Sequence, residues 1–342
     1  MERTKVLIMK KTYYLFNPGR MSRKDNTLKF EPVNENGQYQ KPRYLPVEQV
    51  DQLFCFGSVD ANSAVYNFLG KNDISVHFFD YYENYTGSFQ PKRKLLAGAV
   101  QIAQVKKYVS EEDRILMAQQ FIEGAAHNIL RNLKYYNTRG KDMTPFIEKI
   151  EGLRKHVLQT KNIRELMGIE GNIRMTYYDA FPLIVNDFNM NGRTKQPPQD
   201  EVNSLISFGN MMCYAECLRS IHQTQLDPTI SFLHEPGYRR YSLALDLAEI
   251  FKPILVDRLI FKVLNKKIVQ KSDFDTDLNR IVLKEKGKKA FISGWEERLG
   301  QTIMHRGLKR EVSYKHLIKL ECYKIVKELM KMDNYKPFKA WW

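Results

Sequence analysis

The segment HEPGYRRYSLALDLAEIFKP, residues 234–253, leads from a Pro-Gly turn into an amphipathic helix. Its apolar residues Leu243, Leu247 and Ile250 recur at the spacing of one helix face, which predicts a helix from Ser242 to Leu264. The same period fills most of the chain on either side of this segment. The segment therefore belongs to a predominantly α-helical domain.

That domain is expected to cover residues 93–342. Within it, Asp200 is a suitable N-cap, and the stretch 281–292 is typical of a small basic hairpin. Besides the helix after the Pro-Gly turn, helices are expected at Leu95–Tyr108, Glu111–Tyr136, Met143–Thr160, Asn162–Phe181, Asp200–His222, Gly294–Arg306 and Ser313–Lys331.

Short β-branched or aromatic runs, separated by turn residues, fill residues 1–90. We therefore expect an α+β multidomain fold, in which a small β-rich N-terminal domain (β-sandwich-like with one helix) precedes the larger helical domain. An aromatic, Gly-containing segment near residues 81–92 is expected to be the linker. Strands are expected at Val6–Met9, Thr12–Phe16, Thr27–Phe30, Gln52–Phe56 and Ser75–Phe79, with the helix over Asp60–Phe68.

The chain is strongly basic. Its 342 residues carry 54 Lys and Arg against 39 Asp and Glu, a net charge of +15. Residues 251–342 alone carry 22 Lys and Arg against 11 Asp and Glu, so this last stretch holds +11 of the total. Such a charge favours a polyanionic partner: nucleic acid, an anionic membrane surface or an acidic protein. A solvated helical surface explains the same composition equally well.

Composition excludes several classes of protein. A hydrophobic content of 43% excludes wholesale disorder, and the lack of any run of 18 apolar residues excludes a membrane-spanning helix. Four scattered cysteines do not make a disulfide framework, and Cys213 and Cys217 are expected to pack in the core. Since no secretory signal is recognisable, we expect a cytoplasmic protein. The sequence has no GxxxxGK[ST], GxGxxG, GxSxG, HExxH or CxxC motif.

Acidic residues near the Pro-Gly turn form a candidate metal site. Asp246 and Glu249 are three residues apart and project from one helix face, and His234 lies in a turn that helical packing does not fix. Carboxylates and one imidazole suit a hard divalent cation. A solvated helix face, with Arg239 and Arg240 as ion-pair partners, is the alternative interpretation.

A further acid, Glu170, is flanked by Gly168 and Gly171, whose small size allows a backbone or ligand to approach closely. Basic residues near the acids suggest a phosphate backbone that a metal bridges to the protein, although ordinary surface ion pairing explains them about as well. These basic residues are Arg174, Arg193, Lys195, Arg239, Arg240 and Lys252.

Several motifs of the chain match one family when they are taken together. They are GIEG (168–171) followed by Tyr177 and Tyr178, PPQDEVNSLISFG (197–209), His234-Glu235-Pro236 with SLALDLAE (242–249) and KPI (252–254), WEERL (295–299) and YKPF (335–338). With these motifs the chain resembles the CRISPR-associated endonuclease/integrase of spacer acquisition, the larger of the two adaptation proteins shared by most CRISPR systems. The resemblance covers nearly the whole chain.

The resemblance implies a catalytic site of Glu170, His234, Glu249 and Asp246. Glu170, His234 and Glu249 would coordinate one Mg²⁺ or Mn²⁺, with Asp246 as a nearby supporting carboxylate. Many members have Asp at position 249, so which of Asp246 and Glu249 is the primary ligand stays open. The implied DNA-binding residues are Arg174, Asn203, Arg239, Arg240 and Lys252.

The implied activity is insertion of new spacer DNA into a CRISPR array, by attack of a DNA 3′-hydroxyl on a phosphodiester; with water as nucleophile the same site cleaves DNA. The implied partners are duplex or branched DNA (prespacer and CRISPR repeat), a second copy of the chain paired through the N-terminal domain, and a small ferredoxin-like adaptation protein. A branched-DNA repair nuclease and a non-catalytic, structure-specific DNA-binding scaffold are the alternatives.

Overall fold

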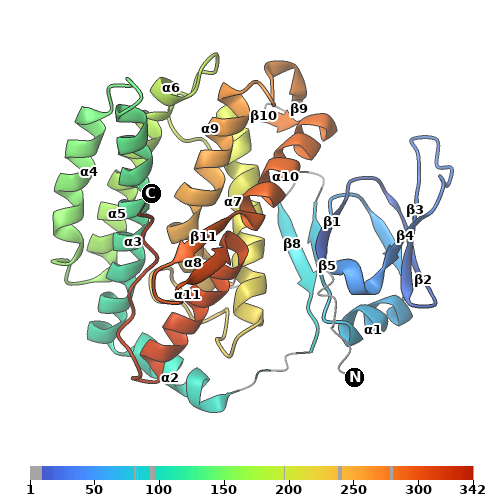
Figure 1. Ribbon diagram of the computed structural model, residues 1–342, viewed down its shortest axis with the longest axis horizontal. Coiled ribbons are helices and arrows are strands. Elements are labelled where there is room, and N and C mark those ends of the chain that lie inside the picture. Colours follow the sequence, from blue (N-terminus) through green and yellow to red (C-terminus); the bar gives the residue numbers. More distant parts are fainter. Residues whose placement is uncertain are drawn as a thin grey trace. The chain divides into compact units, whose positions relative to one another are not determined.

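The computed structural model (Figure 1) contains two compact units, Met1–Lys94 and Leu95–Trp342. The strand expected at Val6–Met9 lies outside the described residues. The structure describes residues 10–80, 82, 84–92, 95, 97–195, 197–237, 241–277 and 280–341.

The first unit contains two four-stranded sheets, β1-β5-β7-β8 and β4-β3-β2-β6, together with helix α1. Apolar side chains from both sheets and from the helix share one core, with Leu28, Leu53 and Leu69 at most 1% exposed. The expected β-sandwich-like architecture with one helix is confirmed. Its elements are β1 (Lys11–Leu15), β2 (Gly19–Lys24), β3 (Thr27–Pro32), β4 (Arg43–Pro46), a 3₁₀ turn (Val47–Gln49), β5 (Val50–Cys55), β6 (Val59–Ala61), α1 (Ser63–Lys71), β7 (Ser75–Phe79) and β8 (Tyr85–Phe89).

Two details of this unit differ from the prediction. The segment predicted as a linker near 81–92 contains β8, which pairs antiparallel with β7. The helix predicted over Asp60–Phe68 begins only at Ser63, because the Asn62 side chain accepts a hydrogen bond from the Val65 N–H and caps it there. Both segments supply strands, β8 and β6, to the edges of the two sheets.

The second unit is mostly helical, as expected, with two small hairpins. Within the part of the chain that is described, no helix is long and apolar enough to cross a membrane. The elements are α2 (Gly98–Val109), α3 (Glu111–Asn137), α4 (Thr144–Val157), α5 (Ile163–Asp179), α6 (Phe181–Ile184), α7 (Glu201–His222), α8 (Ser242–Lys252), a π-helical turn (Pro253–Asp257), α9 (Arg258–Asn265), a 3₁₀ turn (Lys271–Asp273), β9 (Phe274–Asp277), β10 (Arg280–Leu283), α10 (Glu285–Gly300), β11 (Thr302–His305), β12 (Arg310–Ser313) and α11 (Tyr314–Leu329).

The basic hairpin predicted at residues 281–292 is only partly correct. A hairpin exists, but it consists of β9 and β10, and the Lys-rich second half of the predicted hairpin begins α10. The Glu285–Lys289 ion pair, four residues apart, supports that helical turn. The helix predicted over Gly294–Arg306 is correspondingly displaced: it ends at Gly300, and Thr302–His305 form strand β11.

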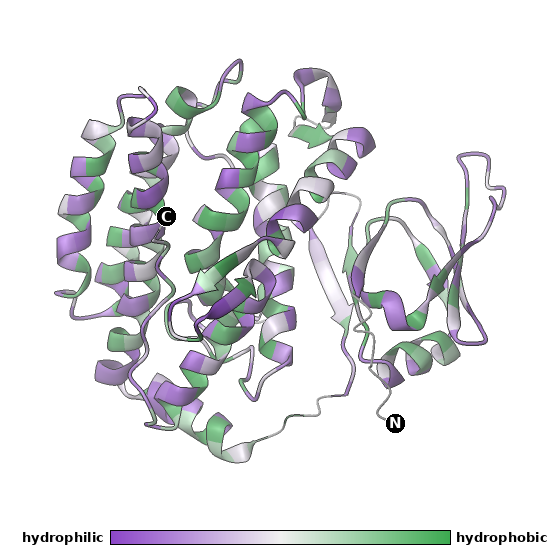
Figure 2. Cartoon of the chain, viewed as in Figure 1, coloured by the Kyte–Doolittle hydropathy of each residue, from purple (hydrophilic) through white to green (hydrophobic). Residues whose placement is uncertain are grey.

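Helix α8 lies in the middle of this unit, against α3, α7 and α11 (Figure 1). The predicted helix Ser242–Leu264 is interrupted by a π-helical turn that starts at Pro253, a residue that removes a backbone donor from the helix. Polar and apolar residues alternate along the surrounding helices (Figure 2), so that their apolar faces bury α8. The core around α8 also contains the thiols of Cys213 and Cys217, which are free and buried as expected.

We expect Gly209→Ala to lower the free energy of unfolding by about 1–3 kcal/mol, the usual range for overpacking a core. A Cβ at Gly209 on α7 would lie 2.4 Å from Cγ1 of Val256 in the π-helical turn. Gly171→Ala on α5 is the matched control: its Cβ would meet no described atom within 4 Å, so we expect no loss and up to about 1 kcal/mol of stabilisation. Urea unfolding measures both; equal stabilities would contradict the packing argument.

Candidate active site

Helix α8 carries two buried acids, Asp246 (0% exposed) and Glu249 (5% exposed). The alternative interpretation of a solvated helix face is therefore wrong. Buried carboxylates are unfavourable unless other groups pair with them, so their partners define what this part of the molecule can do.

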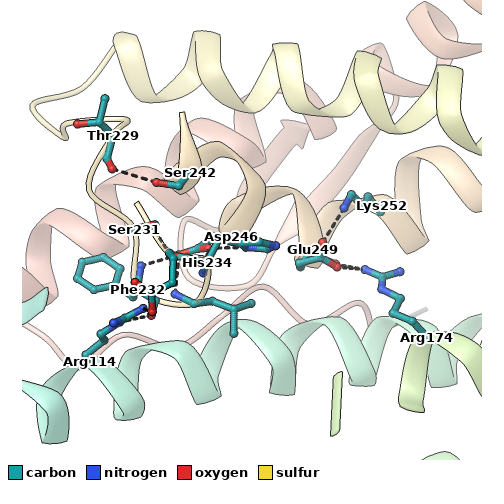
Figure 3. Close-up of polar contacts among 12 residues, drawn as sticks. Arg114, Arg174, Thr229, Ser231, Phe232, His234, Ser242, Asp246, Glu249 and Lys252 are labelled. Carbon is teal, nitrogen blue, oxygen red and sulfur yellow. Dashed lines mark hydrogen bonds and ion pairs between the residues drawn. The ribbon is translucent and has the colours of Figure 1, made fainter. Parts of the chain in front are cut away.

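The Asp246 carboxylate binds the loop that carries His234 (Figure 3). Its Oδ2 accepts hydrogen bonds from the backbone N–H groups of Phe232 (2.7 Å) and Leu233 (2.9 Å). Its Oδ1 accepts from the His234 backbone N–H (2.9 Å) and from the His234 ring Nδ1 (2.8 Å). Because a carboxylate only accepts, Nδ1 carries a proton, so in the neutral ring the lone pair that a ligand would take is on Nε2.

The loop of His234 is held at further points. Arg114 of α3 donates from Nε to the Phe232 carbonyl (2.9 Å), and the Ser231 hydroxyl donates to the His234 carbonyl (Figure 3). Burial disfavours the charged imidazole, but the Asp246 carboxylate outweighs this and raises the pKa of His234. The sequence predicted a ring that helical packing leaves free; hydrogen bonds fix it instead.

The Glu249 carboxylate is enclosed by two cations (Figure 3). Its Oε1 accepts from Lys252 Nζ at 2.6 Å, and its Oε2 accepts from Nη2 of Arg174 on α5. The same Nη2 lies 3.2 Å from the Glu249 carbonyl oxygen. Burial favours the protonated acid, but Arg174 and Lys252 hold the pKa of Glu249 well below its usual range.

Glu170 lies one helical turn before Arg174 on α5, with Oε1 3.5 Å from Arg174 Nε. The guanidinium is thus shared between Glu170 and Glu249. Burial, and then the charge of Glu249, raise the pKa of Glu170. The Glu170 side chain is still 19% exposed, and a Cβ at Gly168 or Gly171 would meet no described atom within 4 Å, so a ligand has room to approach.

The donor set suits a divalent cation. Glu170 and Glu249 offer carboxylate oxygens and His234 offers an imidazole nitrogen, and the charge on His234 influences both acids. Among the described residues, however, no three His, Cys, Asp or Glu side chains converge on one point. In this structure Arg174 and Lys252 hold the carboxylate oxygens that a cation would take.

Comparison with known proteins identifies the family of this chain. The family profile described as "CRISPR associated protein Cas1" matches residues 13–297. The chain belongs to the Cas1 family. It is similar to the CRISPR-associated endonuclease Cas1 of Fusobacterium nucleatum, with 44% identity over 335 residues that cover 98% of each chain.

Solved structures place the Cas1 fold over the whole chain. A Cas1 protein from Thermotoga maritima superposes with a TM-score of 0.83 and 36% identity, covering 96% of this chain and 99% of that one. A casposase bound to its integration product shares the fold at a TM-score of 0.83 and 21% identity, covering 96% and 93%. The family resemblance, the α+β fold and the assignment to the CRISPR-associated endonuclease/integrase family are confirmed.

The residues predicted to contact DNA occupy different surroundings in this Cas1-family chain. Arg239 and Arg240 lie outside the described residues. Arg174 is 9% exposed and paired with the two acids, while Lys252, with a side chain 16% exposed, pairs with Glu249. Both are internal ion-pair residues in this structure.

Direct contact of Asn203 with DNA does not fit the structure. Its side chain is 0% exposed, and Oδ1 accepts from the Thr194 N–H and from Arg193, while Nδ2 donates to the Gly192 carbonyl and to Asp200. All of its hydrogen-bonding capacity is used inside the protein. Asn203 therefore fixes the loop before α7, and the motif match could not show that it is buried.

Sequence reasoning missed one acid, Asp257. It ends the π-helical turn after α8, is 1% exposed, and burial raises its pKa to about 7. The signal available in the sequence was Pro253, because a proline within an apolar helical run indicates an irregular turn, and Asp257 is the acid inside that turn.

Proposed function

We propose that this Cas1-family chain is a divalent-metal-dependent DNA endonuclease and integrase in which Glu170, His234 and Glu249 hold one Mg²⁺ or Mn²⁺. The observation that carries the proposal is the difference in contacts between the two acids of α8. Both carboxylate oxygens of Asp246 accept hydrogen bonds from the His234 loop, whereas Glu249 and Glu170 both pair with Arg174. This arrangement supports Glu249, rather than Asp246, as the ligand, and Asp246 as the residue that orients the imidazole.

The bound ion would polarise the scissile phosphate and stabilise the leaving 3′ oxygen. Residues of the chain itself set the ionisation of Glu249 and the tautomer of His234. Lys252 and Arg174 keep Glu249 ionised despite its burial. Asp246 keeps the His234 proton on Nδ1. A water nucleophile then gives cleavage and a DNA 3′-hydroxyl gives strand joining, so substrate geometry selects the product.

The proposed substrates are duplex or branched DNA, namely a prespacer and a CRISPR repeat. The net charge of +15 supports this, since Lys and Arg neutralise phosphates. Lys252, Arg239 and Arg240 are proposed DNA contacts from the family motif that they flank.

The proposed protein partners are a second copy of the chain, bound through the β-rich unit at residues 1–90, and a small ferredoxin-like CRISPR adaptation protein. The family resemblance implies both partners, and one solved neighbour with this fold is described as a Cas6-RT-Cas1–Cas2 complex. Tyr39 (61% exposed) and Tyr44 (47% exposed) give the β-rich unit exposed aromatic side chains, which are frequent at protein interfaces.

Removal of divalent metal tests the proposed function. We expect protein stripped with EDTA to neither cleave branched DNA nor transfer strands into a repeat-carrying plasmid, and Mn²⁺ or Mg²⁺ to restore both reactions. The stripped protein should still bind duplex DNA in a fluorescence anisotropy assay, and that binding should weaken as salt rises. Undiminished cleavage in EDTA would contradict the metal site.

The same plasmid assay separates the alternative functions. Strand transfer that requires the repeat and the ferredoxin-like partner is expected for spacer acquisition. A repair nuclease would cleave branched DNA without preference for the repeat and without the partner. A scaffold would bind DNA with or without divalent metal and catalyse neither reaction.

A further inference from the structure

Asp257 is a buried acid whose hydrogen bonding is incomplete. It is 1% exposed, and its Oδ2 has no hydrogen-bond partner among the described residues. Burial raises the pKa of Asp257, and the charge of Arg174 is the strongest influence opposing that effect. An unpaired buried carboxylate oxygen is unfavourable, so it calls for an explanation.

Arg174 has a buried donor atom without a partner among the described residues, whereas Asp257 has a buried acceptor atom without one. Its Nε and Nη2 face Glu170 and Glu249, but Nη1 is buried and has no partner in the described part of the chain. Against the cost of burial, Glu249 and, with a smaller effect, Glu170 and Asp257 raise the pKa of Arg174. The guanidinium is therefore paired with two acids, and the charge of a third, Asp257, also acts on it.

The position of Arg174 conflicts with the proposed function. If a divalent cation binds Oε2 of Glu249, it shares that oxygen with Arg174, and both contacts become weaker. A bound cation also repels the guanidinium. Arg174 is 9% exposed, so its charge cannot simply return to water. It needs another acid that is inside the protein and is not itself a metal ligand.

We propose that Asp257 is the positioning residue that forms an ion pair with Arg174 when the Glu249 carboxylate binds a divalent cation instead. The inference rests on the proposed function. The proposed ion pair joins Arg174 Nη1 and Asp257 Oδ2, two buried atoms that lack a hydrogen-bond partner among the described residues. Asp257 thereby acts through Arg174, with no contact to metal or DNA.

Mn²⁺ binding to the full-length protein without DNA tests this role by titration calorimetry. We expect Asp257→Asn to weaken Mn²⁺ binding by about tenfold, a usual size for coupling between two sites. In an Arg174→Met background, Asp257→Asn should leave Mn²⁺ affinity unchanged, because there is no guanidinium to pair with Asp257. Equal weakening in both backgrounds, or none in either, overturns the proposal. Asp273→Asn is the matched control: it removes a buried acid, paired with Lys286, outside this site.

A metal-free measurement separates this inference from the proposed function. Glu249→Gln removes the negative charge that pairs with Arg174 without adding any cation, so Asp257→Asn should lower Tm by about 3 °C more in that background than in the wild type. If the wild type binds no Mn²⁺, the proposed function fails, and a positive result here still supports Asp257 as the acceptor of Arg174. Equal losses of Tm in the two backgrounds overturn it.

Discussion

Replacement of His234 by alanine is expected to lower the rates of DNA cleavage and strand transfer by about a thousandfold. A bound metal would contribute several kcal/mol of transition-state stabilisation, and each 1.36 kcal/mol is a factor of ten in rate. His234 offers the single imidazole of the proposed ligand set, and its Nε2 is free because Nδ1 is bonded to Asp246. Gel assays of cleavage and plasmid strand transfer at saturating Mn²⁺ measure the loss.

Two controls limit what this result can mean. Asp246→Asn keeps the shape of the side chain but removes one acceptor from the His234 loop, so we expect a smaller loss of about 10–100-fold. Both variants should bind duplex DNA with wild-type affinity, because neither residue is proposed to contact DNA. A His234→Ala protein that cleaves at the wild-type rate would exclude His234 from the metal site.

The sequence predicted the local parts of this site. Glu170 and Arg174 are four residues apart on one helix, and Asp246 and Glu249 are three apart on another, so helical geometry alone places each pair together. Spacing could not show which carboxylate of α8 meets the His234 loop. It also could not show that Arg174 reaches Glu249, 75 residues away, because only tertiary packing brings α5 to α8.

The fold was predictable to a similar extent. Long periodic runs such as Glu111–Asn137 matched the prediction within a residue at each end, because both the apolar period and the Ser110 cap indicate the helix. The prediction was wrong for short elements whose residues are compatible with two kinds of secondary structure. Residues 285–292 have a turn-like, Lys-rich composition, yet Phe291, Ile292 and Trp295 bury one face and make the segment a helix.

The second large effect is expected at Asn128 on α3, which binds the C-terminal segment. Residues 335–340 lie along α3 and are bonded to Asn128, which is 1% exposed. Asn128 Nδ2 donates to the carbonyls of Phe338 (3.1 Å) and Ile250 (3.0 Å), and its Oδ1 accepts from the Ala340 N–H (2.8 Å). One amide side chain thus ties the C-terminal segment to α8, the helix that carries Asp246 and Glu249.

We therefore expect Asn128→Ala to lower the free energy of unfolding by about 3–5 kcal/mol, because three buried backbone groups lose a partner at about 1–3 kcal/mol each. Asn172→Ala on α5 is the matched control, since Asn172 is exposed, and its cost should stay within about 0.5 kcal/mol. Urea unfolding measures both variants. Because Ile250 directly follows Glu249, Asn128→Ala should also weaken Mn²⁺ binding, whereas full stability with unchanged Mn²⁺ affinity would show that the C-terminal segment does not brace α8.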